Sequence, residues 1–275
     1  MLSYQHSYHA GNLADVHKHA LLAVMLDYLI RKPKPISYIE THAGRGLYAL
    51  DAAEALKTGE AAAGIGRAGP LLPAGHPYAD VLAATRARHG DAAYPGSPLV
   101  AAQILRASDR MHLSELHPRE FGALKDVMAP YDAVCRQEDG LKRALALTPP
   151  DPRRGLMLID PSYEVKADYD ILPPLIARLH GKWNVGIIAL WYPILQGGAH
   201  RAMGSALDAA NLAGAFRHEI RFPPVREGHG MVGSGLYVVN APYPLPEQAA
   251  RLDTLVARLA GTGPVSSSPP DAADP

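Results

Sequence analysis

The sequence places its clearest chemical signal in the run LIDPSY, residues 158–163, which follows directly on an apolar segment typical of a buried strand. The run brings together the carboxylate of Asp160, the backbone carbonyl of Pro161 and the ring of Tyr163. In open α/β sheets, ligands bind beyond the carboxyl ends of the strands. The two oxygens can accept hydrogen bonds from both N–H groups of an aromatic exocyclic amine while the ring of Tyr163 stacks on the base. These hydrogen bonds would pull the nitrogen out of conjugation with its ring and so make the amine nucleophilic. An Asp-Pro turn with a packing tyrosine is the plain structural alternative.

Glycines and acidic residues follow the other predicted strands. Gly44 and Gly46 come after the strand predicted at 36–41, Glu115 ends the strand predicted at 110–116, and Asp139-Gly140 follows the strand predicted at 133–137. Glycine lets the backbone approach a ligand closely, and a strand-end carboxylate can accept hydrogen bonds from ribose hydroxyls. Together with Asp160 they favour a nucleotide-like site, although each residue alone is also compatible with an ordinary turn or a solvated strand end.

Histidines are dense near the N-terminus, at positions 6, 9, 17 and 19, with a fifth at 42. His17 and His19 are two residues apart on a predicted helix and so face different directions, and no HExxH spacing occurs. We therefore expect no metal site, and the group with Lys18 favours a polar ligand or phosphates. Nucleophilic triad chemistry is weakly supported, because no G-x-S-x-G motif is present and Cys135 lies within a predicted strand.

The elements that must position these residues alternate along the chain. Asn12 is a good N-cap for a helix that runs to the KPKP sequence at 32–35. Strands separated by helices predict a mostly parallel α/β sheet, and the last two strands, with no helix between them, should pair antiparallel at its edge. The later strands are predicted at 156–160, 185–191, 216–222 and 235–240.

Composition changes along the chain and suggests its organisation. Residues 50–93 are rich in alanine, glycine and proline, show short helical patterns and carry no strand signal. We expect this stretch to be a small helical insertion subdomain in a core made of residues 1–49 and 94–260. The tail, residues 261–275, is too polar to bury a core and is expected to be disordered.

Overall composition excludes several classes of protein. The chain has 275 residues, enough for one large domain, and its 27 basic and 27 acidic side chains give a net charge of zero. A protein that coats nucleic acid non-specifically would be more basic, so any such contact must come from local patches. We expect a cytoplasmic protein without a membrane span or signal peptide, because no long apolar run is present and the single cysteine fits a reducing compartment.

The motifs together resemble those of the bacterial large-subunit methyltransferase J family, which methylates the N6 amine of an adenine in 23S ribosomal RNA. The resemblance extends to about residue 245, and the opening segment and the LIDPSYE run are its most specific parts. The resemblance implies a class I, Rossmann-like fold with a small helical insertion, and S-adenosyl-L-methionine as the cofactor. The matching segments are MLSYQHSYHAGNLADVHKH, THAGRG, YPGSPL, SELHP, EDG, GLMLIDPSYE, ALWYP and SGLYVVNAP.

The resemblance also implies roles for individual residues. Asp160 would be the catalytic acceptor and would also bind the cofactor, while Pro161 and Tyr163 complete the amine site on the chemical argument given above. Ser162 departs from the family pattern, since amino-methyltransferases more often have a second proline there. The remaining cofactor-binding positions would be His19, His42, Ser97, Glu115, Asp139 and Gly140, and the residues facing the target adenosine would be Tyr4, His6 and Lys18.

The interpretation we adopt is a methyltransferase that takes its methyl group from S-adenosylmethionine and processes rRNA. The target adenine must be flipped or unstacked, so naked or partly assembled rRNA is the expected partner, with no metal and no membrane. An adenine-N6 DNA methyltransferase is the nearest alternative, although the insertion has no obvious DNA-recognition motif. A catalytically silent RNA-binding protein is the alternative from another class.

Overall fold

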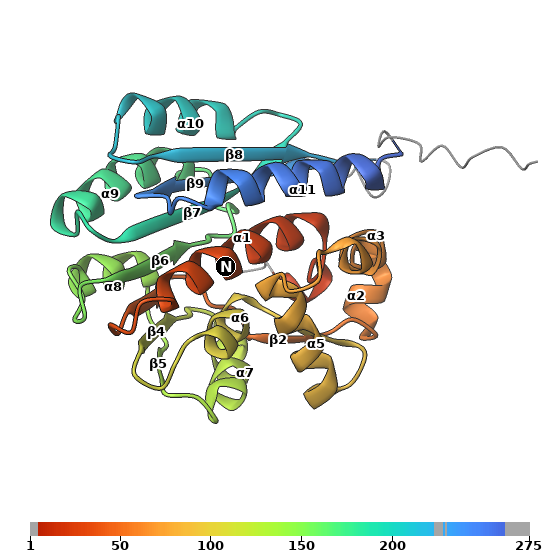
Figure 1. Ribbon diagram of the computed structural model, residues 1–275. Helices are drawn as coiled ribbons and strands as arrows, with labels where there is room; N and C mark the ends of the chain where they lie inside the picture. Colours follow the sequence, from red (N-terminus) through yellow and green to blue (C-terminus); the bar gives the residue numbers. More distant parts are fainter. Residues whose placement is uncertain (1–4, 223–227, 229, 262–275) are drawn as a thin grey trace, which may run out of the picture.

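The computed structural model describes residues 5–222, 228 and 230–261, and its centre is a seven-stranded sheet (Figure 1). The strands lie in the order β5-β4-β1-β6-β7-β9-β8. The first five of these run parallel, whereas β9 is antiparallel to both of its neighbours. The predicted α/β class, with an antiparallel C-terminal edge, is confirmed. The strands are β1 Ser37–Glu40, β4 Arg110–Ser114, β5 Ala133–Arg136, β6 Gly155–Ile159, β7 Ile187–Leu195, β8 Phe216–Arg221 and β9 Met231–Val239.

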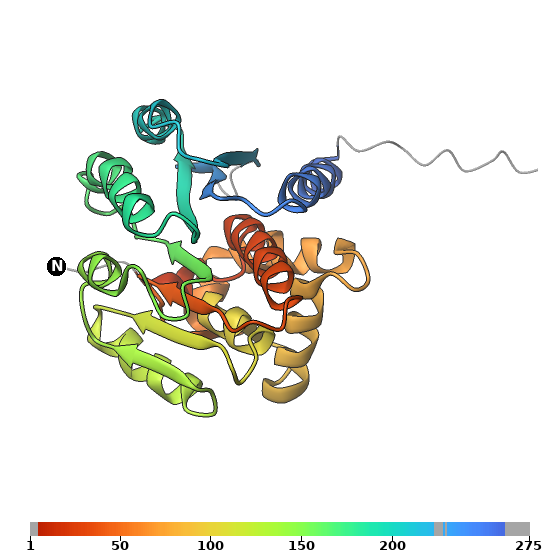
Figure 2. The ribbon, with the colours of Figure 1, turned by 60° about the vertical axis from the view of Figure 1, so that its left-hand side comes forward.

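Helices cover both faces of the sheet because its strands are apolar on both sides. Neighbouring residues of one strand point to opposite faces, so that Tyr38 belongs to one core cluster and Ile39 to the other. The second cluster is closed by three helices, α8 Gly140–Leu147, α9 Asp168–Lys182 and α10 His200–Ala209. The first is closed mainly by α1 Leu13–Ile30, α6 Ser97–Ile104, α7 Pro118–Met128 and α11 Leu245–Leu259, and Figure 2 shows α1 and α11 on the side of the sheet away from α9 and α10.

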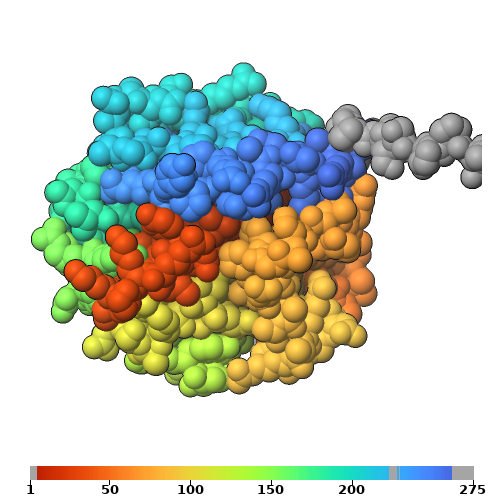
Figure 3. All heavy atoms as spheres, in the orientation of Figure 1, coloured from red at the N-terminus to blue at the C-terminus, as the bar shows by residue number. Residues whose placement is uncertain are grey.

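Helix α1 is buried on nearly all sides. Asn12 caps it by accepting a hydrogen bond from the N–H of Asp15, as predicted, and every residue from 14 to 26 is buried. The helix contacts α5, α6, α11 and β9, and Figure 3 shows its surface as a narrow strip beside α11 and the helices of residues 50–92. A helix apolar all round belongs in a core. The polar side chains of its first turns, Asp15, His17, Lys18 and His19, are consequently held inside the protein.

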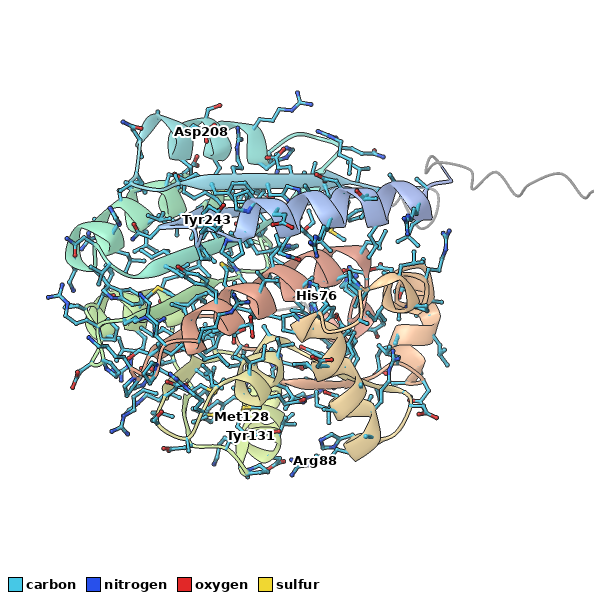
Figure 4. The ribbon with its side chains drawn as sticks, viewed as in Figure 1. His76, Arg88, Met128, Tyr131, Asp208 and Tyr243 are labelled. Carbon is cyan, nitrogen blue, oxygen red and sulfur yellow. The ribbon has the colours of Figure 1, made fainter. Side chains whose placement is uncertain are left out.

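Residues 50–92 form a group of short helices framed by two strands that the sequence did not predict. The frame is an antiparallel pair of three residues each, β2 Leu47–Ala49 and β3 Ala93–Pro95. Strands this short carry no alternation long enough to recognise. His76, labelled in Figure 4, caps the longest helix by accepting from the N–H of Tyr78. The helices are α2 Ala53–Thr58, α3 Glu60–Ala63, α4 Ile65–Ala68, the 3₁₀ turn η2 Gly69–Leu71 and α5 Pro77–His89.

The structure describes neither the first four residues nor the last fourteen. Before α1, a 3₁₀ turn, η1 His6–Tyr8, starts the described chain, and Tyr4 lies outside the described residues. The predicted disordered tail also lies outside them, apart from Gly261. Within the described ranges, no helix has both the length and the hydropathy needed to cross a membrane.

Candidate functional site

The predicted site residues meet at the carboxyl edge of the parallel strands. Strand β1 ends in a turn, residues 41–46, in which Gly44 and Gly46 have φ values of 61° and 81°. Residues with side chains rarely adopt these angles, so the turn requires both glycines. The residues that follow the neighbouring strands are Glu115 after β4, Asp139 after β5 and Asp160 after β6, which is the arrangement expected of a ligand site in an open α/β sheet.

An ion pair between Lys18 and Asp160 lies at the centre of this edge. Lys18 Nζ is 2.6 Å from Asp160 Oδ2, and the lysine side chain is 5% exposed whereas that of Asp160 is 13% exposed. Burial lowers the pKa of Lys18, but Asp160 and Asp15 outweigh it and raise the pKa above its ordinary value, so the ammonium stays charged. Among the described residues, none donates a hydrogen bond to Asp160 Oδ1. That oxygen is available to accept an N–H bond from a substrate.

Asp15 connects this pair to the N-terminal segment. Its Oδ1 lies 3.2 Å from Lys18 Nζ, and its Oδ2 is 2.9 Å from His6 Nε2. The carboxylate is 2% exposed; burial raises its pKa, but His6, Lys18 and His19 together bring the pKa well below the ordinary value. Asp15 therefore stays ionised and joins the two predicted substrate residues, His6 and Lys18. Asp15 was not singled out from the sequence, although its i,i+3 spacing to Lys18 was a usable signal.

Pro161 and Tyr163 form the turn after β6, and both are buried. Tyr163 has φ of 56°, a left-handed conformation that costs a non-glycine residue about 1 kcal/mol or more, and its hydroxyl donates to the carbonyl of Trp191 at 2.8 Å. Its ring packs against Tyr169 with centroids 4.7 Å apart. Most of the ring face is consequently in contact with protein. The ring of Trp191, which sequence reasoning did not single out, is only partly buried and lies 5.3 Å from Lys18 Nζ.

Glu115 holds the glycine turn in place. Its Oε2 accepts from the N–H of Gly44 at 2.8 Å and its Oε1 accepts from the N–H of His117 at 2.7 Å. Burial raises the pKa of Glu115, while these two donors oppose that change. A carboxylate has about four acceptor positions, so two remain for hydroxyl donors of a ligand.

Asp139 and Gly140 begin helix α8 against the end of β1. Asp139 accepts from the N–H groups of Leu141 and Lys142 as the N-cap of the helix. A Cβ on Gly140 would stand 1.8 Å from the carbonyl oxygen of Thr41, so only glycine permits this approach. The N-terminus of α8 is thereby brought against the turn that carries Gly44.

His42 links these strand ends electrostatically. Its Nδ1 is 2.7 Å from Thr41 Oγ1, and burial lowers the pKa of His42 to about 4 although Asp160 and Asp139 both act to raise it. The imidazole is therefore neutral near pH 7 and can both donate and accept hydrogen bonds. Both carboxylates, at the ends of β5 and β6, are near enough to His42 to act on its charge.

His19 and Ser97 lie deeper in the protein than the other predicted cofactor residues. His19 is 1% exposed, with Nδ1 3.0 Å from Tyr94 Oη, and burial lowers its pKa to about 3. Ser97 Oγ donates to Glu40 Oε1 at 2.5 Å, and the other oxygen of Glu40 accepts from Tyr38 at 2.8 Å. The contacts given for both side chains are therefore with buried protein groups. Glu40, which ends β1 and was also missed, has its pKa raised to about 8 by burial.

The arrangement fits the cofactor that the resemblance implies. The turn with Gly44 lets backbone approach a ligand at the end of β1, and Gly140 lets the start of α8 pack against that same turn. Carboxylates at three strand ends, Glu115, Asp139 and Asp160, suit a ligand rich in hydroxyl and amino donors and carrying positive charge. In the part of the chain that the structure describes, no group of three His, Cys, Asp or Glu residues is placed to hold a metal ion. His17 and His19 do face different ways, since His17 contacts Ser234 and His218.

Comparisons with known proteins find relatives that match nearly the whole chain. A family model described as "Ribosomal RNA large subunit methyltransferase D, RlmJ" matches residues 33–266. The chain is 39% identical over 271 residues to Ribosomal RNA large subunit methyltransferase J of Escherichia coli (strain K12), covering 96% of each chain. The protein of the same name from Haemophilus influenzae is 37% identical over 253 residues, covering 90% of each. A crystal structure of a Legionella pneumophila protein superposes with a TM-score of 0.83 at 33% identity, covering 93% of this chain and 95% of that one.

Proposed function

Because the chain belongs to the ribosomal RNA large subunit methyltransferase J family, we propose that it methylates the N6 amine of an adenine in 23S rRNA, with S-adenosylmethionine as the methyl donor. The observation that carries the assignment of the site is the Lys18–Asp160 pair at the end of β6, with an N···O distance of 2.6 Å. It holds Asp160 in place and leaves the other oxygen of its side chain without a hydrogen bond from any described residue.

The residues of the site act by positioning and by charge. Asp160 Oδ1 and the carbonyl oxygen of Pro161 accept hydrogen bonds from the two N–H groups of the adenine amine. These bonds orient the nitrogen lone pair toward the methyl group of the cofactor. When bound, S-adenosylmethionine supplies a methyl group on a positively charged sulfur. Transfer of that methyl group would place positive charge on the amine nitrogen, which the carboxylate of Asp160 would stabilise until the nitrogen loses a proton to solvent. Lys18 fixes the orientation of Asp160 through Oδ2.

Of the other site residues, some would bind the cofactor and some would bind the substrate. Glu115 would accept hydrogen bonds from the ribose hydroxyls, and Asp139, Gly140 and His42 would line the rest of the cofactor site. His19 and Ser97, buried under this edge, would support it through Tyr94 and Glu40. His6 and the predicted residue Tyr4, which lies outside the described residues, would face the adenosine. Partly exposed Trp191 adds a ring beside Lys18 on which a base can stack.

The substrate form, the cellular location and the domain division are further parts of the proposal. An adenine inside a helical stack cannot reach Asp160, so naked or partly assembled 23S rRNA in the cytoplasm is the proposed substrate. Residues 1–49 and 94–260 would form the catalytic core and residues 50–93 an insertion.

Transfer of label from S-adenosylmethionine tests the proposal against its alternatives. Purified protein is incubated with labelled cofactor and, separately, with transcribed 23S rRNA or with duplex DNA of matched length. Label is expected in the RNA and, after digestion, in N6-methyladenosine. Label in the DNA alone would make the chain a DNA methyltransferase, and RNA binding without transfer to either would make it a silent binder.

A further inference from the structure

A buried carboxylate in residues 50–93, Glu60, joins these helices to the N-terminal segment. Glu60 is 1% exposed at the start of α3. Its Oε1 and Oε2 lie 3.1 Å and 3.0 Å from His9 Nδ1, and Oε2 also accepts from Asn12 Nδ2 at 3.1 Å. Burying a carboxylate costs free energy unless hydrogen-bond donors compensate it. Here the donors, His9 and Asn12, belong to the N-terminal segment, about fifty residues away in the sequence.

Other contacts hold the same segment along its backbone. Thr58 Oγ1 donates to the carbonyl of Tyr8 at 2.7 Å, and the N–H of Ile65 donates to the carbonyl of Gly11, also at 2.7 Å. A Cβ on Gly64 would lie 2.2 Å from that same carbonyl oxygen, so the two backbones are in direct contact. Four residues of the N-terminal segment, Tyr8, His9, Gly11 and Asn12, are thereby attached to the helices between residues 50 and 93.

A short series of side-chain contacts connects these attachments to Asp160, the proposed catalytic carboxylate. Asn12, which donates to Glu60, accepts from the N–H of Asp15 through its Oδ1 at 2.9 Å. Asp15 in turn contacts Lys18 Nζ at 3.2 Å, and Lys18 contacts Asp160 at 2.6 Å. Asp15 also holds His6 and accepts from the N–H of Gly11 at 3.0 Å. Displacing Asn12 would therefore disturb the residues on both sides of the amine site.

We propose that the helices of residues 50–93 act as a clamp on the N-terminal segment, and that Glu60 is a positioning residue which sets the geometry of His6 and Lys18 through His9 and Asn12. The role follows from contacts within the chain, and it assigns the insertion to the assembly of the site. As far as it concerns catalysis, this inference rests on the proposed function.

The test compares Glu60→Ala and Glu60→Gln with Asp51→Ala, an acidic residue of the same region that is exposed. In Glu60→Ala, backbone amides of residues 8–12 should exchange hydrogen faster, and kcat on a 23S rRNA fragment should fall about 10- to 100-fold, as expected when reacting groups are misplaced. Affinity for S-adenosylmethionine should stay at the wild-type value. Glu60→Gln keeps an acceptor for His9 and Asn12 and should recover part of the lost kcat, and Asp51→Ala should match the wild type.

A purely structural role of Glu60 would lower the melting temperature and leave kcat unchanged at a temperature where the variant is fully folded. A wild-type kcat in Glu60→Ala under that condition overturns the proposal. If Glu60→Ala does not fold, Thr58→Val removes the bond to the Tyr8 carbonyl, together with the longer contacts of the same hydroxyl to the Ala55 carbonyl and the N–H of Glu60, and must shift exchange and kcat in the same directions; wild-type values there also overturn it. If the wild-type protein methylates no RNA, the proposed function fails, and unchanged exchange at residues 8–12 in the variants would separately refute the clamp.

Discussion

At the scale of single residues, Glu115 has two tasks, because it binds the glycine turn and is proposed to bind the ribose. Glu115→Ala removes acceptors for the N–H groups of Gly44 and His117. Hydrogen bonds to a charged group contribute about 1.5–3 kcal/mol each, so affinity for S-adenosylmethionine should fall at least about tenfold while RNA affinity stays near wild type. Calorimetry with each ligand measures this. The matched control is Glu247→Ala, which removes an exposed i,i+4 ion pair of little energetic value. Unchanged cofactor affinity in Glu115→Ala would remove Glu115 from the site.

Tyr163 is expected to contribute to stability through its hydroxyl. Tyr163→Phe loses the hydrogen bond to the Trp191 carbonyl, which should lower the free energy of unfolding by about 1 kcal/mol, with kcat only slightly reduced. Urea unfolding and steady-state kinetics measure the two effects, and Tyr243→Phe, at a side chain that is 92% exposed, is the control (Figure 4). A collapse of kcat with stability intact would show that the hydroxyl takes a direct part in the chemistry.

Sequence reasoning at this scale found residues that follow strands and missed those that depend on long-range packing. Asp160 and Glu115 were predicted at strand ends, and the structure brings both to one edge of the sheet. Glu40 and Glu60 were missed because an acidic residue in a helix or strand gives no local sign that distant donors will surround it. The burial of the Tyr163 ring was equally out of reach, since it depends on Tyr169 and Trp191.

At the scale of elements, the contact between the start of α8 and the end of β1 should tolerate no side chain. Gly140→Ala would force a Cβ to within 1.8 Å of the Thr41 carbonyl, so the backbone must shift, with a loss of about 1–3 kcal/mol in stability and weaker cofactor binding. Gly122→Ala in α7 is the control, because a Cβ there meets nothing within 4 Å and alanine favours a helix. Thermal unfolding of both variants checks this, and equal stability of the two would contradict the proposed packing constraint.

The presence of the strands of the main sheet was easier to predict than the residues at which they begin and end. The run LMLID gave β6 to within one residue, whereas β7 was predicted at 185–191 and extends over Ile187–Leu195. Its last residues belong to the strand because β9 pairs with them across the sheet, and no local pattern encodes that pairing. Helix α11 was not predicted, although leucines at 245, 252, 255 and 259 follow a helical spacing.

At the scale of the whole molecule, the buried carboxyl of Glu40 should make folding stability depend on pH. Burial raises the pKa of Glu40 in the folded chain to about 8, from an ordinary 4.5. Between these values the folded chain holds a proton that the unfolded chain has released, so this group lowers the free energy of unfolding as pH rises, by at most about 1.4 kcal/mol per pH unit. Glu40→Gln should therefore gain stability relative to the wild type from about pH 5 to about pH 8. Urea unfolding of both proteins across this range decides it, and a constant difference would show that Glu40 titrates normally.

The most direct test of the account is the rate at which the protein forms N6-methyladenosine in unmethylated 23S rRNA when Asp160 is changed to asparagine. Asparagine keeps the size of the side chain and one acceptor oxygen but loses the negative charge that stabilises the amine as it becomes cationic. Nucleoside analysis by mass spectrometry under single-turnover conditions, with saturating cofactor, reports the chemical step alone. We predict a rate about 100- to 1000-fold below that of the wild type, with the fold intact by circular dichroism. A folded Asp160→Asn protein that methylates at nearly the wild-type rate would contradict the central role assigned to this carboxylate.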